Sequence, residues 1–214
     1  MKKILLISSD FNTDVIPIWK GTWDVLKKNH PKIKVSVFVV PFWKSDFQKD
    51  IVKNVYFKEW YKERKNWVEI GQQGYTNSYP PECTRFKKPQ GIILKRGYRK
   101  LSNYMPQDFY YFKPSYDRMD DNITINILKN LGFSACIWNK SIIMLKKCDN
   151  PISEDCEIIQ TKINIEERNP DDIKVLFKKL DDSFYEFEQQ DCEFITFRDL
   201  IYDCFKKEKA EVEN

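Results

Sequence analysis

Short apolar runs alternate with helical patterns along most of this sequence, and this alternation restricts the fold more than any other feature. The first run, residues 2–9, contains Ile4-Leu5-Leu6-Ile7 without a charge, which is typical of a strand buried on both faces of a parallel sheet. The predicted strands cover residues 2–9, 33–40, 67–70, 108–112, 133–138, 141–145, 157–163 and 193–197, and the predicted helices cover 17–30, 46–65, 89–101, 122–131, 170–180 and 198–206. This order predicts an α/β fold with a mainly parallel sheet, either open or closed into a small distorted barrel.

Length and composition predict one packed domain. The chain has 214 residues, of which 42% are hydrophobic and 15% aromatic, enough to bury a sizeable core. No repeat, Gly/Ser linker or low-complexity segment divides it. We therefore predict a single domain over residues 1–206 and a charged, frayed tail over 207–214. The net charge of +4 is mild and acidic and basic residues are mixed, so we expect no nucleic-acid partner.

The sequence also predicts a cytoplasmic protein. No apolar run approaches the roughly 18 residues of a membrane-spanning helix, and we expect no membrane partner. The apolar segment after Met1-Lys2-Lys3 is too short for a signal peptide. Six scattered cysteines without a paired spacing favour reduced thiols over disulfides.

The stretch from Gly71 to Cys83 has the features of a site loop, because it follows a strand and carries glycine and polar residues. Gln73 and Asn77 are four residues apart, so one turn of helix or a tight loop can aim both at one point. Two histidines at this spacing would indicate a metal pair. An amide nitrogen is no metal ligand, and an amide oxygen is a weak one for zinc. The loop therefore resembles a metal site without its metal ligands.

Other candidate residues follow from the rule that ligands bind at the carboxyl ends of parallel strands. The sequence places one carboxylate, two lysines, amides and aromatics there: Ser9, Asp10, Asn12, Trp43, Gln73, Tyr75, Asn77, Lys113, Ser115, Tyr116, Trp138, Lys162 and Asn164. Structural roles compete with functional ones, since Asp10 can cap its loop, Lys113 can be a surface lysine, and both tryptophans can be core or rim residues. The single histidine, His30, ends the first helix, where contact with the helix C-terminus is its simplest role.

Together these segments resemble the polysaccharide deacetylase family of carbohydrate esterases (the NodB homology fold), and the resemblance covers most of the chain. Ile7-Ser8-Ser9-Asp10 resembles the first family motif, with Ser9 in place of the first of two aspartates, and the second motif's histidine pair falls on Gln73 and Asn77. Phe112-Lys113-Pro114-Ser115 resembles the Arg-Pro-Pro motif, and Ile159-Gln160-Thr161-Lys162 resembles the strand that carries the acid histidine. Thr196 to Leu200 is similar to a common family ending. The resemblance implies a distorted (β/α) barrel of about seven strands.

The resemblance implies a metal-dependent deacetylase, but this chain departs from the family at both histidine ligands, at the acid histidine and at the base. We therefore predict a pseudoenzyme that binds a carbohydrate or related small ligand in the inherited cleft, with no cofactor. The predicted catalytic positions are Asp10, Lys162 and Lys113, and the predicted ligand-binding residues are Asn12, Trp43, Gln73, Tyr75, Asn77, Tyr116 and Trp138. One of the two lysines is predicted to pair with Asp10, because an unpaired carboxylate in a cleft is costly.

Two alternatives stay open at this point. One is an active metal-dependent carbohydrate deacetylase that binds zinc through altered ligands, namely Asp10, Asn77 and Cys83. The other is an interaction scaffold, with a protein partner or a homo-oligomer. Bound metal with deacetylase turnover would favour the first, and a large exposed apolar patch outside the cleft would favour the second.

Overall fold

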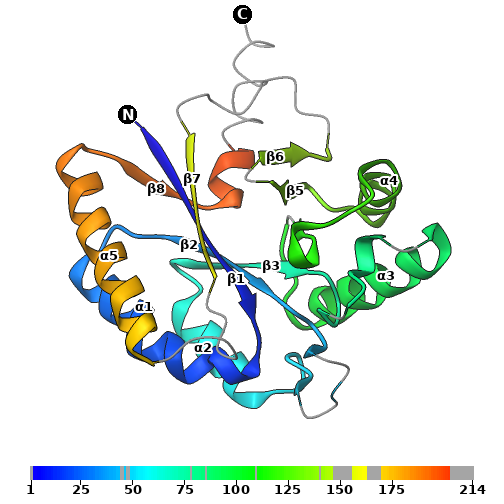
Figure 1. Ribbon diagram of the computed structural model, residues 1–214, viewed down its shortest axis with the longest axis horizontal. Helices are drawn as coiled ribbons and strands as arrows, with labels where there is room; N and C mark the ends of the chain where they lie inside the picture. The colour runs from blue at the N-terminus through cyan, green and yellow to red at the C-terminus, as the bar shows by residue number, and fades with distance from the viewer. Residues whose placement is uncertain are drawn as a thin grey trace, which may run out of the picture.

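In the computed structural model, one curved sheet lies at the centre of the molecule, and helices surround it (Figure 1). The strands are β1 (Lys3–Phe11), β2 (Val35–Val39), β3 (Val68–Gln73), β4 (Tyr111–Lys113), β5 (Ala135–Trp138), β6 (Ser141–Met144), β7 (Cys156–Lys162) and β8 (Glu193–Ile195). The helices are α1 (Ile16–Asn29), α2 (Val55–Arg64), α3 (Lys87–Tyr104), α4 (Asp121–Leu131) and α5 (Pro170–Gln189). The structure describes residues 2–43, 46, 49–77, 79–84, 86–108, 110–139, 141–146, 156–162 and 170–202, with the backbone alone at 160–162, 170 and 172.

The strand order is β6-β5-β4-β3-β2-β1-β7, and β8 also pairs with β1. Among these eight described strands, every pairing is parallel except that of β5 with β6. β7 pairs with β1 from Lys3 to Ser9, while β8 pairs with Lys3–Leu5 and β2 with residues from Ile7 onward, so β8 and β2 share the other edge of β1. The sheet curls into a nearly closed barrel, which confirms the predicted distorted (β/α) barrel.

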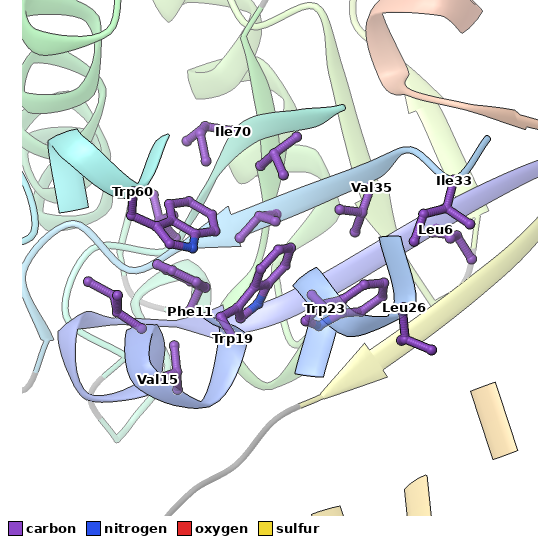
Figure 2. Packing of buried hydrophobic residues seen from close by; sticks show 14 of the residues in the cluster. Leu6, Phe11, Val15, Trp19, Trp23, Leu26, Ile33, Val35, Trp60 and Ile70 are labelled. Carbon is purple, nitrogen blue, oxygen red and sulfur yellow. The ribbon is translucent and has the colours of Figure 1, made fainter. Parts of the chain in front are cut away.

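The outer face of the sheet buries its apolar residues under α1, α2 and α5. Figure 2 shows the centre of this layer, where Trp19 and Trp23 of α1 lie close to Phe11 of β1 and Trp60 of α2. Trp19 stacks on Trp23 with ring centroids 5.0 Å apart and meets Trp60 edge-on at 5.0 Å. Aromatic pairs of this kind add about 0.5–1.5 kcal/mol to the free energy gained by burying their area. This cluster holds α1 and α2 against the strands.

The inner face of the barrel has its own apolar filling, because side chains alternate between the two faces of each strand. Leu5 and Ile7 point to the same cluster as Phe38 and Tyr111. The segment after β8 enters this cluster through Phe197, Leu200 and Ile201. A separate apolar cluster lies beneath α3 and α4. The barrel interior is therefore a packed core, and a ligand site is confined to its ends.

Several element bounds differ from the prediction, among them those of α2, β3 and α5. The second helix begins at Val55 rather than at residue 46, because the Asn54 side chain caps it by accepting from the Phe57 N–H at 3.0 Å. β3 continues three residues past residue 70, through Gly71. Glycine is required there, since a Cβ atom would lie 2.6 Å from the Phe38 ring. The last long helix extends to Gln189 rather than to residue 180.

The remaining predictions concern the cysteines, membrane-spanning helices, the C-terminal tail and the cellular location. The cysteines within the described ranges, Cys83, Cys136, Cys156 and Cys192, are free thiols. No helix among the described residues is both long and apolar enough to cross a membrane. The tail predicted over 207–214 lies outside the described residues, and the cytoplasmic location stays a prediction.

Candidate functional site

Backbone conformations that are rare for L-residues gather where the strands end. Most residues in the left-handed region follow strands: Asp10 near the end of β1, Gly74 and Asn77 after β3, Tyr116 and Asp117 after β4, and Asn139 after β5, whereas Gly132 and Asp191 follow helices. A non-glycine residue in such a conformation costs on the order of 1–3 kcal/mol, and such residues gather at functional sites. We therefore take this end of the barrel, its mouth, as the candidate site.

A β-bulge places Asp10 at the mouth. Ser8 pairs with Val37 and Phe11 with Val39, so β1 has one more residue than β2 over this interval. Asp10 lies within the bulge with φ 61°. A bulge shifts the alternation of side chains and can re-aim one of them. As a result, Phe11 packs in the outer core while Asp10 contacts the loop after β3.

Asp10 and Gln73 form a closed pair of two hydrogen bonds. The Gln73 Nε2 donates to Asp10 Oδ1 at 2.6 Å, and the Asp10 backbone N–H donates to Gln73 Oε1 at 2.7 Å. This arrangement fixes the orientation of the amide, because the reversed one would set an oxygen against the carboxylate. Gln73 is buried. Both polar atoms of its side chain are therefore engaged with one residue.

Asn77 approaches the same carboxylate oxygen. Its Nδ2 donates to Asp10 Oδ1 at 3.4 Å, a long contact, and its backbone carbonyl accepts from the Tyr116 hydroxyl at 3.0 Å. Its Oδ1 is buried and has no hydrogen-bond partner among the described residues. The two amides four residues apart thus meet at one atom, as their spacing predicts, although Gln73 ends a strand and Asn77 lies in a loop.

Lys113 does not supply the positive charge predicted for Asp10. Its ammonium group is buried and forms an ion pair with Asp117, four residues along the chain. In the part of the chain that the structure describes, the Asp10 carboxylate instead accepts hydrogen bonds from neutral amides. Lys162 ends β7 beside Ser9, but its side chain lies outside the described residues, so its pairing with Asp10 stays a prediction.

The loop after β3 is braced by buried groups that the sequence did not single out. Glu82 Oε1 accepts from the backbone N–H and the hydroxyl of Thr76, both at 2.8 Å. Gly74 has φ 46°, and a Cβ atom there would overlap the Ser115 hydroxyl oxygen and lie 2.9 Å from Glu82 Oε2. Asn12, predicted to bind ligand, caps the turn after β1 by accepting from the Asp14 N–H at 2.8 Å. These contacts fix the positions of Asp10 and Asn77.

The aromatic residues of the mouth divide into buried and exposed ones. Trp43 is only 6% exposed and Tyr75 9%, so neither offers the free ring face predicted for stacking. Tyr116 is 49% exposed, and Tyr79, which was not among the predicted site residues, is 77% exposed. Their rings meet edge-on with centroids 6.4 Å apart. Trp138 is half-buried and donates from Nε1 to the Asp117 carbonyl at 3.0 Å. Tyr79 directly precedes the Pro-Pro turn, and this position is the sequence feature that could have identified it as a site residue.

The residues present at the mouth do not fit a metal centre. No group of three or more His, Cys, Asp or Glu suited to a metal occurs within the described ranges. Two N–H groups point at Asp10 Oδ1, where a cation would bind. The Cys83 side chain packs in the apolar cluster beneath α3 and α4, and burial raises its thiol pKa well above the ordinary value, which disfavours the thiolate that a metal needs. The alternative set of Asp10, Asn77 and Cys83 is thus chemically unsuited to zinc.

No protein-family model matches the sequence, and no curated protein matches it either. Solved structures do match its fold. A mutant of a CE4 family pseudoenzyme from Bacillus anthracis, described as having restored enzymatic activity, matches with a TM-score of 0.62 and 14% identity over 93% of this chain and 67% of that chain. The peptidoglycan N-acetylglucosamine deacetylase Bc1960 matches with a TM-score of 0.61 and 12% identity, over 92% and 87% of the two chains.

A family 4 acetyl xylan esterase from Clostridium thermocellum, solved with a cobalt ion, matches with a TM-score of 0.58 and 12% identity over 94% of this chain and 91% of that chain. Identities this low show a shared fold and leave the chemistry to the site itself. The chain therefore has the fold of the CE4 polysaccharide deacetylases.

Proposed function

We propose that this chain is a deacetylase-like pseudoenzyme that binds a carbohydrate at the mouth of its barrel without metal-dependent hydrolysis. The observation that carries the proposal is the closed pair between Asp10 and Gln73. A cation that bound Asp10 Oδ1 would have to displace the amide hydrogen bonds to it, and hydrogen bonds to a charged group contribute about 1.5–3 kcal/mol each. The amides therefore take the place of a metal.

The composition of the mouth supports a carbohydrate as the ligand. A sugar has an apolar ring face and a rim of hydroxyl groups, so it suits sites that combine aromatic rings with a few fixed polar groups. Tyr79 and Tyr116 expose their rings, and Asp10 and Asn77 supply carboxylate and amide groups close to Tyr116. Among the fold neighbours, one structure is that of a pseudoenzyme mutant with restored activity, so this fold is known both with and without catalysis.

The first experiment measures metal content. Wild-type protein and the variant Gln73→His/Asn77→His are purified, incubated with zinc and dialysed against metal-free buffer before elemental analysis. We expect the wild type to be metal-free and the variant to retain zinc, because two imidazoles then join Asp10. The matched control is Asn122→His/Asn126→His, a pair with the same spacing on the exposed side of α4 without an adjacent Asp10. Stoichiometric metal in the wild type would overturn the proposal.

The second experiment measures binding of an N-acetylglucosamine oligomer by calorimetry. Tyr79→Ala and Tyr116→Ala should each weaken binding about tenfold, the equivalent of roughly 1.4 kcal/mol of lost ring contact. Tyr56→Ala and Tyr185→Ala remove tyrosines that are equally exposed but lie on α2 and α5, and they should leave the affinity unchanged. Equal effects of all four substitutions would contradict binding at the mouth.

A further inference from the structure

The net positive charge of the chain comes from one helix, α3. The sequence contains 36 basic and 32 acidic residues. α3 contributes six of the basic residues and none of the acidic ones, so acidic residues outnumber basic residues by two in the rest of the chain. The net charge of +4 therefore describes one cationic helix on an otherwise slightly acidic protein.

The exposed side of α3 carries several cations around one exposed large aliphatic residue, Ile92, which is 47% exposed. Its buried side consists of Gln90, Leu94, Gly97 and Leu101. The opposite side exposes Lys88, Lys95, Arg96 and Arg99, which we call the α3 basic face. These four residues extend over about 16 Å at 1.5 Å per residue. The face is thus long enough to contact several charged groups of an extended ligand.

The α3 basic face is not neutralised by its surroundings. Among the described residues, no carboxylate lies within ion-pair distance of its four side chains, whereas the neighbouring Lys100 is paired with Asp50. Arg64 and Lys34 are likewise paired, with Asp24 and Asp199, whereas the four cations of the α3 basic face form no such pair among the described residues. Their field adds up at the surface and attracts anions.

The charges of α3 also oppose its own stability. Arg99 lies three and four residues after Arg96 and Lys95, and like charges at these spacings destabilise a helix by about 0.2–0.5 kcal/mol per pair. Lys87 and Lys88 occupy the first turn, which contains no acidic residue, although the positive end of the helix dipole favours anions there. The like charges and the basic first turn both destabilise α3 without a local gain in stability, which indicates that these charges serve a function.

We infer that the α3 basic face binds an acidic polysaccharide, a sugar polymer whose units carry carboxylate, sulfate or phosphate groups. This inference rests on the proposed carbohydrate site at the mouth. α3 begins directly after the loop that carries Asn77 and Tyr79, and its cap residue Phe86 is 88% exposed. A sugar chain bound at Tyr79 and Tyr116 would have to continue onto the first turn of α3, the next helix of the chain. A membrane surface is the weaker match, because Ile92 is the single exposed large aliphatic residue of α3.

The test compares two variants that each lose four positive charges. One is Lys88→Gln/Lys95→Gln/Arg96→Gln/Arg99→Gln. The other is Lys20→Gln/Lys28→Gln/Lys178→Gln/Lys179→Gln, which removes exposed lysines from α1 and α5, across the molecule from α3 (Figure 1). The probe is an oligogalacturonate, and its affinity is measured at low and at high salt. We expect the α3 variant to bind at least about tenfold more weakly, the control to match the wild type, and wild-type binding to fall with added salt.

Equal losses in the two variants would overturn the inference, because net charge alone would then explain binding. Wild-type binding to single-stranded DNA or to vesicles of anionic phospholipid, without binding to oligogalacturonate, would overturn it as well. The uncharged N-acetylglucosamine oligomer separates this inference from the proposed function. If that oligomer fails to bind while oligogalacturonate binding depends on α3, the proposed carbohydrate site at the mouth is refuted and the inference about the α3 basic face is supported. If the oligomer binds and the α3 variant binds oligogalacturonate as tightly as the wild type does, only the inference about the α3 basic face is refuted.

Discussion

Glu69 makes the stability of this protein depend on pH in a direction that can be calculated. It lies early in β3 and is only 3% exposed. Its carboxylate accepts from the Ser36 hydroxyl at 3.1 Å and from the Arg198 backbone N–H at 3.2 Å, and the Arg198 guanidinium lies 3.8 Å away. Burial raises the pKa of Glu69 from 4.5 to about 7, although the Tyr111 hydroxyl, Arg198 and Ser36 oppose the shift. The charged form is therefore disfavoured in the folded protein.

Because this pKa is higher in the folded than in the unfolded state, the folded protein binds more protons between about pH 4.5 and 7. The contribution of Glu69 to the free energy of unfolding is therefore greatest below pH 4.5 and declines as the pH rises through this window. A shift of this size corresponds to about 3 kcal/mol at 1.36 kcal/mol per pKa unit. Glu69→Gln removes the titration and keeps an oxygen that can accept hydrogen bonds.

The assay is urea unfolding followed by tryptophan fluorescence at several pH values from 4.5 to 8.5. Glu69→Gln should match the wild type near pH 4.5 and exceed its stability by up to about 3 kcal/mol at pH 8. The control Glu59→Gln alters an exposed glutamate of α2 and should follow the wild type at every pH. A difference between Glu69→Gln and the wild type that stays constant with pH, or that favours the wild type as the pH rises, would refute this account of Glu69.

Three further substitutions test the packing. Gly74→Ala should lower the free energy of unfolding by about 1–3 kcal/mol, because φ is positive and the Cβ atom would overlap neighbouring oxygens; Gly91→Ala, which meets nothing closer than 4.0 Å, should be neutral or slightly stabilising in the same urea titration. Trp19→Ala should cost about 3–5 kcal/mol in thermal unfolding, and a loss no greater than that of Val25→Ala, at a 51% exposed position on the same helix, would contradict the packing. His30→Ala removes contacts of 3.0 and 3.1 Å to two acidic side chains of α5 and should increase hydrogen exchange of α5 amides; unchanged exchange would show that this contact does not hold the helix.

Much of the fold was predictable from local patterns. Residues 2–9 and 33–40 were expected as buried strands, and the structure has β1 and β2 there. The helix predicted over 122–131 ends at Leu131, and Gly132 follows it with φ 86°. Such features depend on neighbouring residues, because apolar periodicity and a left-handed glycine are properties of a short segment. The second helix was expected too early, since its start depends on the Asn54 cap and on the segment before it, where Asp50 pairs with Lys100 of α3.

The sequence by itself determined the α/β class, the position of the site loop and the absence of histidines from it, because these follow from residue identity and short-range periodicity. Only the tertiary structure decided what that loop contacts. The bulge at Asp10, the closed pair with Gln73 and the ion pair of Lys113 with Asp117 depend on strand register and on the backbone conformation after β4. Asp10 and Gln73 are 63 residues apart, and no local pattern specifies which distant side chain a carboxylate will meet. Register and burial are set by the packing of the whole barrel, and they determine whether a polar residue binds a ligand or supports its neighbour.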